Sequence, residues 1–164
     1  MRTTVYLSLG SNLGDREFNL RSAISRLKTL GEVTKISSFY ETEPVEFTEQ
    51  PWFLNCAVEM QTSLAPQELL HGLLALERKM GRERFQPKGP RLIDLDILLF
   101  DDLTLHEPGL TIPHPAMHER RFVLEPLSEI AAEIKHPVLQ KKIIELRRML
   151  PANSPLVRKV EVST

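Results

Sequence analysis

Two aspartates open an apolar segment near the middle of the chain. The segment DLDILLF has the leucine and isoleucine content of a sheet strand, and Asp94 and Asp96 lie at its start. Side chains two apart on a strand point to the same face, so the two carboxylates lie side by side. Leu95, Ile97 and Leu99 are then expected on the other face. Two like charges on neighbouring positions of a buried strand repel and resist desolvation, so the pair needs a source of positive charge.

Divalent metal ions are the source of charge that this arrangement fits best. Mg²⁺ prefers oxygen ligands and commonly takes one or two carboxylates together with substrate phosphates. Two adjacent carboxylates can hold two metal ions roughly 3.5–4 Å apart, the geometry used for displacement at phosphorus. The pair therefore predicts two Mg²⁺ ions held by Asp94 and Asp96. The alternative is that Asp94 is a solvated turn residue and Asp96 makes a surface ion pair.

A basic segment precedes the carboxylate pair. Arg82, Arg84, Lys88 and Arg91 fall within ten residues that also contain two prolines. Guanidinium groups match the geometry of phosphate oxygens, so this segment indicates a polyphosphate clamp, with a solvated basic loop as the alternative. Glu77, one turn before the end of the preceding helical pattern, is a candidate for orienting an arginine or binding an adenosine hydroxyl. It is equally compatible with a surface position.

Aromatic side chains and one asparagine form a second set of candidates. Trp52, Phe53 and Phe122 lie outside the helical patterns. A flat heterocycle would be held well between two such rings, although ordinary core packing is the alternative. Asn55 is expected on the same sheet face as the carboxylates, and its amide can both donate and accept hydrogen bonds. This combination suits the edge of a pterin or a nucleic-acid base.

Composition limits the class of protein. The chain has 164 residues, of which 41% are hydrophobic, and a net charge of −1. These values fit one domain with a real core and give no general attraction to nucleic acid. The single cysteine, Cys56, excludes a disulfide framework, indicates a reducing compartment and falls on an apolar strand face. No apolar run approaches the ~20 residues that span a bilayer. We therefore expect one cytoplasmic domain over residues 1–164, monomeric, with no nucleic-acid or membrane partner.

The elements that must position these residues follow from hydrophobic periodicity. Strands are predicted at residues 3–10, 33–42, 53–62 and 94–100, and helices at residues 16–31 and 65–81. This order predicts an α+β fold, a ferredoxin-like βαββαβ antiparallel sheet with both helices packed on one face. For the rest of the chain we expect a hairpin at LFDDLTLHE, residues 99–107, an extended crossing at IPHP, and C-terminal helices, the last of them over residues 138–150.

The opposite face of the predicted sheet is then the floor of a binding site, unless the remaining chain covers it. The polar residues expected on that face are Tyr6, Ser8, Asn55, Glu59, Asp94 and Asp96. The apolar positions of the same strands are expected to face the helices.

Together these segments resemble one enzyme family. KGPRLIDLDIL closely resembles the signature of the 6-hydroxymethyl-7,8-dihydropterin pyrophosphokinases. GSNLGD, SSFYETEPV, QPWFLNCAVE, LERKMGRER and IPHPAMHERRFVLEPL also match, in order, over most of the chain. The resemblance implies that ATP, as co-substrate, donates its β,γ-pyrophosphoryl group to the hydroxymethyl oxygen of the pterin. AMP would be released in this step of folate biosynthesis.

The resemblance also implies roles for individual residues. Asp94 and Asp96 would bind two Mg²⁺ ions, while Arg82 and Arg91 would assist the transfer. The residues expected to line the ATP site are Glu77, Arg84, Arg91, Ile97, His114 and Arg120. The residues expected to contact the pterin are Thr42, Pro44, Val45, Phe53, Asn55 and Phe122, with the two phenylalanines as stacking rings.

Two other functions are alternatives to this one. Ferredoxin-like sheets also serve as RNA-binding modules, but these need aromatic residues on the open sheet face and a characteristic motif that this sequence lacks. The second alternative is another two-metal phosphoryl or nucleotidyl transferase, for which an extended basic track along a nucleic acid would be expected, and the sequence lacks such a track. Release of AMP from ATP in the presence of Mg²⁺ and the reduced pterin distinguishes the three.

Overall fold

The computed structural model describes residues 2–43, 51–81 and 92–160. The strands of the main sheet are β1 (Thr3–Ser11), β2 (Glu32–Ile36), β3 (Phe39–Thr42), β4 (Phe53–Thr62), β5 (Asp94–Phe100) and β8 (Val157–Val160). The helices are α1 (Arg16–Arg26), α2 (Pro66–Lys79), α3 (Arg121–Ala131) and α4 (Ile143–Arg148), and β6 (Leu105–Glu107) and β7 (Leu110–Ile112) form a separate hairpin. The main sheet is antiparallel, in the order β5-β1-β4-β3-β8, and β2 pairs with another part of β4.

The first two helices form where the sequence predicts them. Asp15 caps α1 by accepting a hydrogen bond from the Phe18 backbone N–H at 3.0 Å. Pro66 occupies the first turn of α2, where its missing N–H costs nothing. Gly31 follows α1 and a short 3₁₀ turn, and a Cβ at that position would lie 2.3 Å from the Gln61 carbonyl oxygen. The helix therefore ends at a point where only glycine lets the backbone pass beside β4.

The predicted strand over residues 33–42 is two strands instead of one. Ser37 separates β2 from β3, and its hydroxyl accepts the Ala57 backbone N–H at 2.8 Å. The Ser37 backbone N–H donates to the Ala57 carbonyl oxygen at 2.9 Å. The N–H of Ala57 on β4 is thus bound by a side-chain hydroxyl instead of a backbone carbonyl, so the regular ladder stops at Ser37 and resumes at Phe39.

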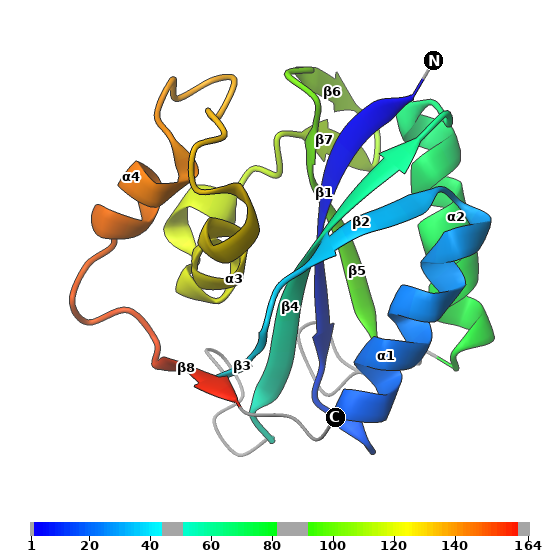
Figure 1. Ribbon diagram of the computed structural model, residues 1–164, viewed down its shortest axis with the longest axis horizontal. Coiled ribbons are helices and arrows are strands. Elements are labelled where there is room, and N and C mark those ends of the chain that lie inside the picture. Colours follow the sequence, from blue (N-terminus) through cyan, green and yellow to red (C-terminus); the bar gives the residue numbers. More distant parts are fainter. Residues whose placement is uncertain (1, 44–50, 82–91, 161–164) are drawn as a thin grey trace.

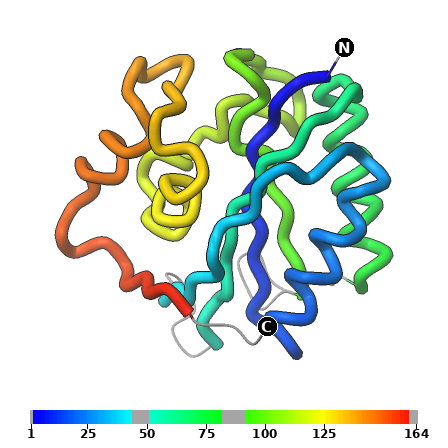
Figure 2. The backbone as a smooth tube through the Cα atoms, in the orientation of Figure 1, coloured from blue at the N-terminus to red at the C-terminus, as the bar shows by residue number. Residues whose placement is uncertain are grey.

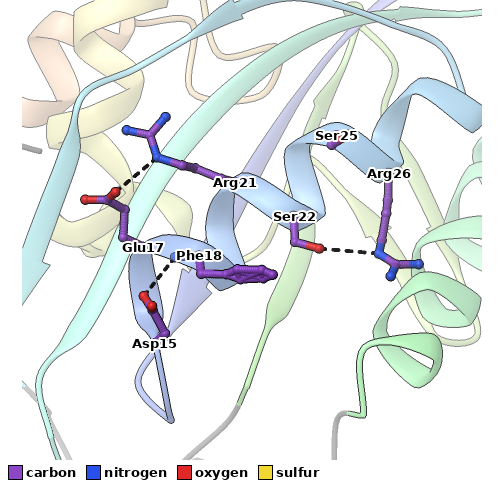
Figure 3. Close-up of a pocket in the computed structure, with 7 residues that line it drawn as sticks. All are labelled: Asp15, Glu17, Phe18, Arg21, Ser22, Ser25 and Arg26. Atoms are coloured by element: carbon purple, nitrogen blue, oxygen red, sulfur yellow. Dashed lines mark hydrogen bonds and ion pairs between the residues drawn. The ribbon is translucent and has the colours of Figure 1, made fainter. Parts of the chain in front are cut away.

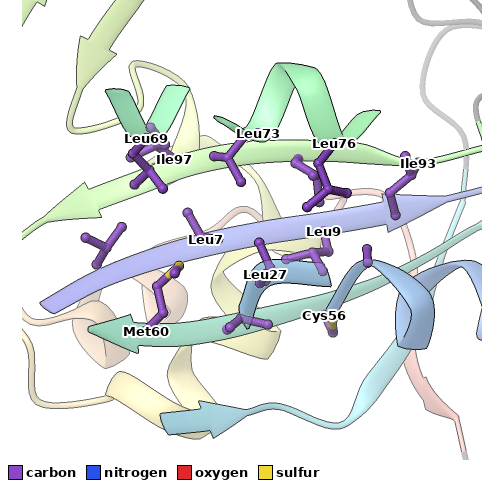
Figure 4. Packing of buried hydrophobic residues seen from close by; sticks show 14 of the residues in the cluster. Leu7, Leu9, Leu27, Cys56, Met60, Leu69, Leu73, Leu76, Ile93 and Ile97 are labelled. Carbon is purple, nitrogen blue, oxygen red and sulfur yellow. The ribbon is translucent and has the colours of Figure 1, made fainter. Parts of the chain in front are cut away.

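Helices α1 and α2 cover one face of the sheet, as expected, and α3 covers much of the other, with α4 packed against α3 (Figure 1). Figure 4 shows the packing on the first face, where Leu7 and Leu9 of β1 meet Leu73 and Leu76 of α2. On the second face Tyr6, Ala57, Leu98 and Leu99 pack with Val123, Leu124 and Leu127 of α3. The polar floor expected over the whole second face is therefore confined to the part that α3 leaves uncovered.

A β-bulge in β5 corrects the predicted orientation of Leu99. Tyr6 pairs with Leu99 but Leu7 pairs with Ile97, so Leu98 is an extra residue in the ladder. Leu98 and Leu99 consequently both lie in the cluster under α3, while Phe100 lies in the cluster under α1 and α2. The expectation that Leu99 shares a face with Leu95 and Ile97 is wrong, because alternation is interrupted after Ile97.

The C-terminal third agrees with the sequence only in outline. A hairpin forms, but later in the chain than predicted: β6 pairs with β7 and lies in a different sheet from β5, so the hairpin turns after Glu107 and not within residues 99–107. Helix α4 is shorter than the predicted helix over residues 138–150. Helix α3 and strand β8 were not individually predicted, and Pro126 lies inside α3. Across the described ranges, every helix is too short or too polar to traverse a lipid bilayer.

Candidate active site

Three strands bring the candidate residues together at one end of the sheet. Gly10 of β1 pairs with Asn55 of β4 on one side and with Asp94 of β5 on the other. Ser8, two residues earlier, pairs with Asp96. Paired residues of an antiparallel sheet direct their side chains to the same face, so the asparagine and both carboxylates share one surface. Since neighbouring strands lie about 4.8 Å apart, Asn55 and Asp94 are roughly 10 Å apart across β1.

Gly10 is fitted closely to the side chain of Asn55. A Cβ at position 10 would lie 2.7 Å from Asn55 Nδ2 and 3.6 Å from Phe53 Cδ1. The Asn55 amide therefore lies over the glycine, in space that any larger residue would take. Gly10 was not among the predicted site residues, although a glycine inside a strand pattern is a signal of close approach.

The carboxylates at the start of β5 are positioned from α2. Asp94 and Asp96 are half-buried. The backbone N–H of Leu95, between them, donates to Glu77 Oε2 at 2.8 Å, and Glu77 is 3% exposed. The surface position considered for Glu77 is therefore wrong, and this contact fixes the start of the strand that carries both aspartates. Its predicted contact with ATP stays a prediction.

The donor set at Asp94 and Asp96 fits Mg²⁺. In the described part of the chain no group of three or more histidine, cysteine, aspartate or glutamate side chains could hold a metal ion. A site with two carboxylates instead leaves coordination positions for water and substrate phosphates, which is how Mg²⁺ is usually held in phosphoryl-transfer sites.

His114 lies in the electrostatic neighbourhood of both Asp94 and Arg120. The His114 backbone N–H donates to the Leu98 carbonyl oxygen at 3.0 Å, which places this residue beside β5. Burial lowers the pKa of His114, the positive charge of Arg120 lowers it further, and the charge of Asp94 opposes both. His114 Nδ1 accepts the Ala116 backbone N–H at 3.2 Å, so the neutral ring carries its proton on Nε2 and can donate to an anionic oxygen.

The start of α3 carries the second predicted ring. The Arg120 guanidinium carbon lies 5.4 Å from the centre of the Phe122 ring, within the range of a cation–π contact. Phe122 is in the first turn of α3 and is half-buried. A residue predicted for ATP and a residue predicted for the pterin are thus neighbours in space, as a site that joins both substrates requires.

Two buried polar atoms lie near Phe53. Thr42 is 3% exposed and Asn55 is 4% exposed. Within the described ranges, neither Thr42 Oγ1 nor Asn55 Oδ1 has a hydrogen-bond partner. Thr42 pairs with Phe53 in the ladder between β3 and β4, so these three residues share a face of the sheet. Because buried acceptors without partners are costly, such atoms are expected to be satisfied by a ligand or by water.

Glu129 of α3 is a further residue that sequence reasoning missed. Its carboxylate accepts hydrogen bonds from the Ser38 backbone N–H at 2.9 Å, the Ser38 hydroxyl at 3.1 Å and the Tyr40 hydroxyl at 2.7 Å. Tyr40 in turn pairs with Asn55 in the sheet. Glu129 therefore ties α3 to β3, and no local pattern could reveal it because the partners are far apart in sequence.

One predicted residue lies on the other face of the sheet, and five lie outside the described residues. Arg82, Arg84, Arg91, Pro44 and Val45 lie outside the described residues. Ile97 is 5% exposed and belongs to the apolar cluster under α1 and α2, on the face opposite the carboxylates. Its contact with ATP remains a prediction. Cys56, expected in the core, is fully buried there, and burial raises the pKa of its thiol.

A hollow of about 660 Å³ along α1 is separate from this surface. Figure 3 shows its lining residues and the contacts among them. Glu17 accepts from Arg21, and Ser22 accepts from Arg26, so the polar groups along the helix interact with one another. This hollow lies on α1, which covers the face of the sheet opposite the carboxylates and Asn55 (Figure 1).

A family model and two bacterial relatives that match this chain carry the name of the same enzyme. Residues 6–132 match the family described as 7,8-dihydro-6-hydroxymethylpterin-pyrophosphokinase. The chain is 48% identical over 137 residues to the 2-amino-4-hydroxy-6-hydroxymethyldihydropteridine pyrophosphokinase of Bacillus subtilis, a match covering 82% of each chain. It is 42% identical to the protein of the same name from Aquifex aeolicus, with 88% of this chain and 90% of that protein covered.

Other relatives are much longer. The folic acid synthesis protein fol1 of Pneumocystis carinii is 44% identical over 82% of this chain, which spans 18% of that protein. Among solved structures, Plasmodium falciparum HPPK-DHPS with pterin and p-hydroxybenzoate has a TM-score of 0.73 at 20% identity, covering 90% of this chain and 42% of that one. At that identity the likeness shows the fold alone. The family match over residues 6–132 and the 48% identity to the Bacillus enzyme show that the chain belongs to the 7,8-dihydro-6-hydroxymethylpterin-pyrophosphokinase family.

Proposed function

We propose that the protein transfers the pyrophosphoryl group of ATP to the hydroxymethyl oxygen of 6-hydroxymethyl-7,8-dihydropterin, giving AMP and the pterin diphosphate in folate biosynthesis. One observation in the structure carries this proposal. Two buried acceptors without described partners, on Asn55 and Thr42, share a sheet face with the carboxylate pair. A polar heterocycle over β4 would place an attached hydroxymethyl group toward metal-bound phosphates over β5.

The pterin side of the site is assigned to Thr42, Phe53, Asn55 and Phe122. Asn55 has both a donor and an acceptor, which suits the alternating groups along the edge of a pterin ring. Phe53, on the same face, and Phe122, at the start of α3, would cover the two faces of the ring. Pro44 and Val45 are proposed to complete this side of the site.

The nucleotide side is assigned to the residues around β5. Asp94 and Asp96 would hold two Mg²⁺ ions, which neutralise phosphate charge and orient the leaving group when bound. His114 Nε2–H and the Arg120 guanidinium would donate to phosphate oxygens. Glu77 and Ile97 are proposed to line the ATP site, together with Arg82, Arg84 and Arg91 from the basic segment.

The reaction moves the pyrophosphoryl group whole. The hydroxymethyl oxygen forms a bond to the β-phosphorus and gives up its proton to solvent, and the bond from that phosphorus to the oxygen bridging the α- and β-phosphates breaks, releasing AMP. Little covalent chemistry is required of the protein. Its side chains orient the two substrates and stabilise charge, which are the main contributions in phosphoryl transfer.

The architecture supports a single catalytic unit. The order β1, α1, β2 and β3, β4, α2, β5, with β1 between β4 and β5, supports a ferredoxin-like core. We propose that residues 1–164 form one pyrophosphokinase domain and that it acts as a cytoplasmic monomer. Sedimentation of the purified chain tests the oligomeric state.

The test of the reaction is product analysis. The purified protein is incubated with MgCl₂, ATP and the reduced pterin, with each component omitted in turn, and the nucleotides are separated by chromatography. Formation of AMP and pterin diphosphate in equal amounts, only in the complete mixture, is the expected result. ADP would indicate transfer of a single phosphate, and free pyrophosphate would indicate a nucleotidyl transferase. Either would contradict the proposal.

A further inference from the structure

The C-terminal strand β8 lies beside the strand that carries Thr42. In the pairing of β3 with β8, Thr42 is opposite Val157 and Glu41 is opposite Arg158. The ladder continues beyond the strands, because the Glu43 backbone N–H donates to the Leu156 carbonyl oxygen at 3.0 Å. Figure 2 shows the chain passing from α4 around the outside of the molecule to reach this edge. The family match ends at residue 132, so β8 lies beyond it.

Glu41 connects β8 with the start of α1. Its Oε2 accepts from the Arg16 guanidinium at 2.9 Å. Its Oε1 accepts from Arg158 Nε at 3.2 Å and from the same guanidinium's terminal nitrogen at 2.9 Å. Burial by itself would raise the pKa of Glu41, but the hydrogen bonds and charges of the two arginines outweigh burial and hold that pKa below its usual value. The carboxylate is therefore ionised at neutral pH and holds both cations.

The same two arginines also contact the residue before Phe53. Arg16 donates to the Trp52 carbonyl oxygen at 2.9 Å, and the Arg158 guanidinium lies 5.1 Å from the centre of the Trp52 ring. The network thus joins the end of β3 to the start of β4, the two places from which Thr42 and Phe53 project.

The network lies on the face of the sheet opposite the candidate pterin site. Side chains alternate along a strand, so Glu41 faces α1 while Thr42 faces the other way. Glu41 is therefore placed to fix the geometry of the strand ends without touching the pterin. Displacement of a binding group by about 1 Å can cost a large factor in activity even when the mutated residue is remote from the chemistry.

We propose that Arg16, Glu41 and Arg158 are positioning residues for the pterin, so that the C-terminal strand contributes to pterin affinity. This inference rests on the function proposed above. The network holds in place the two strand ends that carry Thr42 and Phe53, and β8 supplies one of its three members. The contribution of Arg158 to global stability is small, since its side chain is 63% exposed and exposed ion pairs contribute little, whereas the side chains of Arg16 and Glu41 are 29% and 18% exposed.

The test compares Glu41→Gln and Arg158→Met with a matched control, Arg2→Met. Arg2 also pairs with a glutamate, Glu32, but it precedes β1 at the end of the sheet away from Gly10. Calorimetry measures binding of a non-hydrolysable ATP analogue with Mg²⁺, and then binding of the reduced pterin at saturating analogue. Steady-state assays give KM for each substrate and kcat.

We expect pterin Kd and KM to rise about tenfold in Glu41→Gln and Arg158→Met, because geometric misplacement weakens a pre-organised site. The Kd of the ATP analogue stays within about twofold of wild type, which is the size of effect expected where no contact changes. Arg158→Lys, which keeps the charge but loses the fork, falls between wild type and Arg158→Met. Arg2→Met leaves both ligands unchanged.

Two results would overturn the inference. Equal loss of pterin and nucleotide affinity, or a lower melting temperature with both affinities intact, would show a purely structural network. If Arg158→Met does not fold, Arg158→Lys decides, because a lysine cannot form the two guanidinium hydrogen bonds to Glu41. Wild-type pterin affinity in folded Arg158→Lys protein would then also reject the idea. Failure of the proposed function looks different, because the wild-type protein would then release no AMP from ATP and the pterin.

Discussion

The two faces of the central sheet are built for different purposes. Under α1 and α2 the central side chains of β1, Val5, Leu7 and Leu9, have no exposed surface and pack against apolar residues of the helices. On the other face the apolar cluster under α3 is smaller, and polar residues such as Glu59 and Asn55 are buried or nearly so. One set of strands therefore carries a dry core on one side and a mixed surface on the other.

The difference shows where stability and binding are located. Burial of apolar area on the first face stabilises the fold without constraining the chemistry. On the second face Glu59 accepts a hydrogen bond from the Tyr6 hydroxyl at 2.6 Å, so this polar group is satisfied internally. Asn55 Oδ1 has no such partner within the described ranges. Buried polar atoms that only a ligand can pair destabilise the ligand-free protein, and the apolar area buried under α1 and α2 offsets that loss of stability.

The largest effect is expected at the carboxylate pair. Asp94→Asn and Asp96→Asn should each lower kcat by roughly 10³-fold or more, because each variant removes a charge needed to hold Mg²⁺ at the transferring phosphates. Both variants should remain folded, as far-UV circular dichroism would show. Near-normal AMP release by either variant at saturating Mg²⁺ would mean that the metal assignment is wrong.

On the apolar face under α1 and α2, a substitution is expected to lower stability and to leave turnover unchanged. Leu7 is fully buried in the middle of β1, so Leu7→Ala should lower the free energy of unfolding by about 2–5 kcal/mol, measured by urea denaturation. Turnover per folded molecule should stay close to wild type. Leu7→Met is the control, because it nearly conserves volume and should cost less than about 1.5 kcal/mol. A large loss of kcat in folded Leu7→Ala protein would show that the two faces are not separable.

These two faces were not equally predictable from the sequence. The strands β1, β4 and β5 and the helices α1 and α2 have local signals, such as the alternation around Val58 and the glycine at position 31. The co-facial placement of Asp94 and Asp96 also follows from alternation alone. The bulge at Leu98 does not, because it depends on how β5 matches β1 across the ladder.

The covering of the second face was the largest omission. Helix α3 contains Pro126, which removes a helical hydrogen bond, so local rules disfavour a helix there. The helix is held instead by tertiary contacts, including Leu124 and Leu127 against the sheet and Glu129 bound to β3. Strand β8 has four residues, and its pairing partner β3 lies more than a hundred residues earlier. Elements that depend on distant partners in this way leave little trace in a local pattern.

A smaller effect is expected at Asn55. Asn55→Ala should weaken pterin binding by about 1–3 kcal/mol, because polar groups of the bound heterocycle would lose their partner. Binding of the ATP analogue should not change. Loss of Asn55 Oδ1 should also change the free energy of unfolding little, because this atom has no described hydrogen bond to lose. Calorimetric titration with each ligand is the measurement, and equal losses for both would place Asn55 outside the pterin site.

The smallest effect is expected from Gly10→Ala, which tests how closely the second face is fitted. The added Cβ would meet Asn55 Nδ2 at 2.7 Å, so the amide must rotate or shift. The cost of this clash is limited, because the Asn55 amide is the end of a side chain and can move. Replacing glycine by alanine also reduces the conformational freedom of the unfolded chain, and this reduction stabilises a protein by about 0.4–1 kcal/mol where the backbone is compatible. The stability of Gly10→Ala should therefore be close to that of wild type.

Pterin affinity should nevertheless fall in Gly10→Ala, by about tenfold or less, since the displaced amide can no longer meet the ring edge. The double variant Gly10→Ala/Asn55→Ala separates this cause from others. If the methyl group acts only by moving the amide, it should have almost no further effect once the amide is absent, and the two substitutions will be strongly non-additive. Additive losses would mean that the methyl group obstructs the pterin or the phosphates directly. The space over Gly10 would then be occupied by a bound substrate and would not serve only to hold the Asn55 amide.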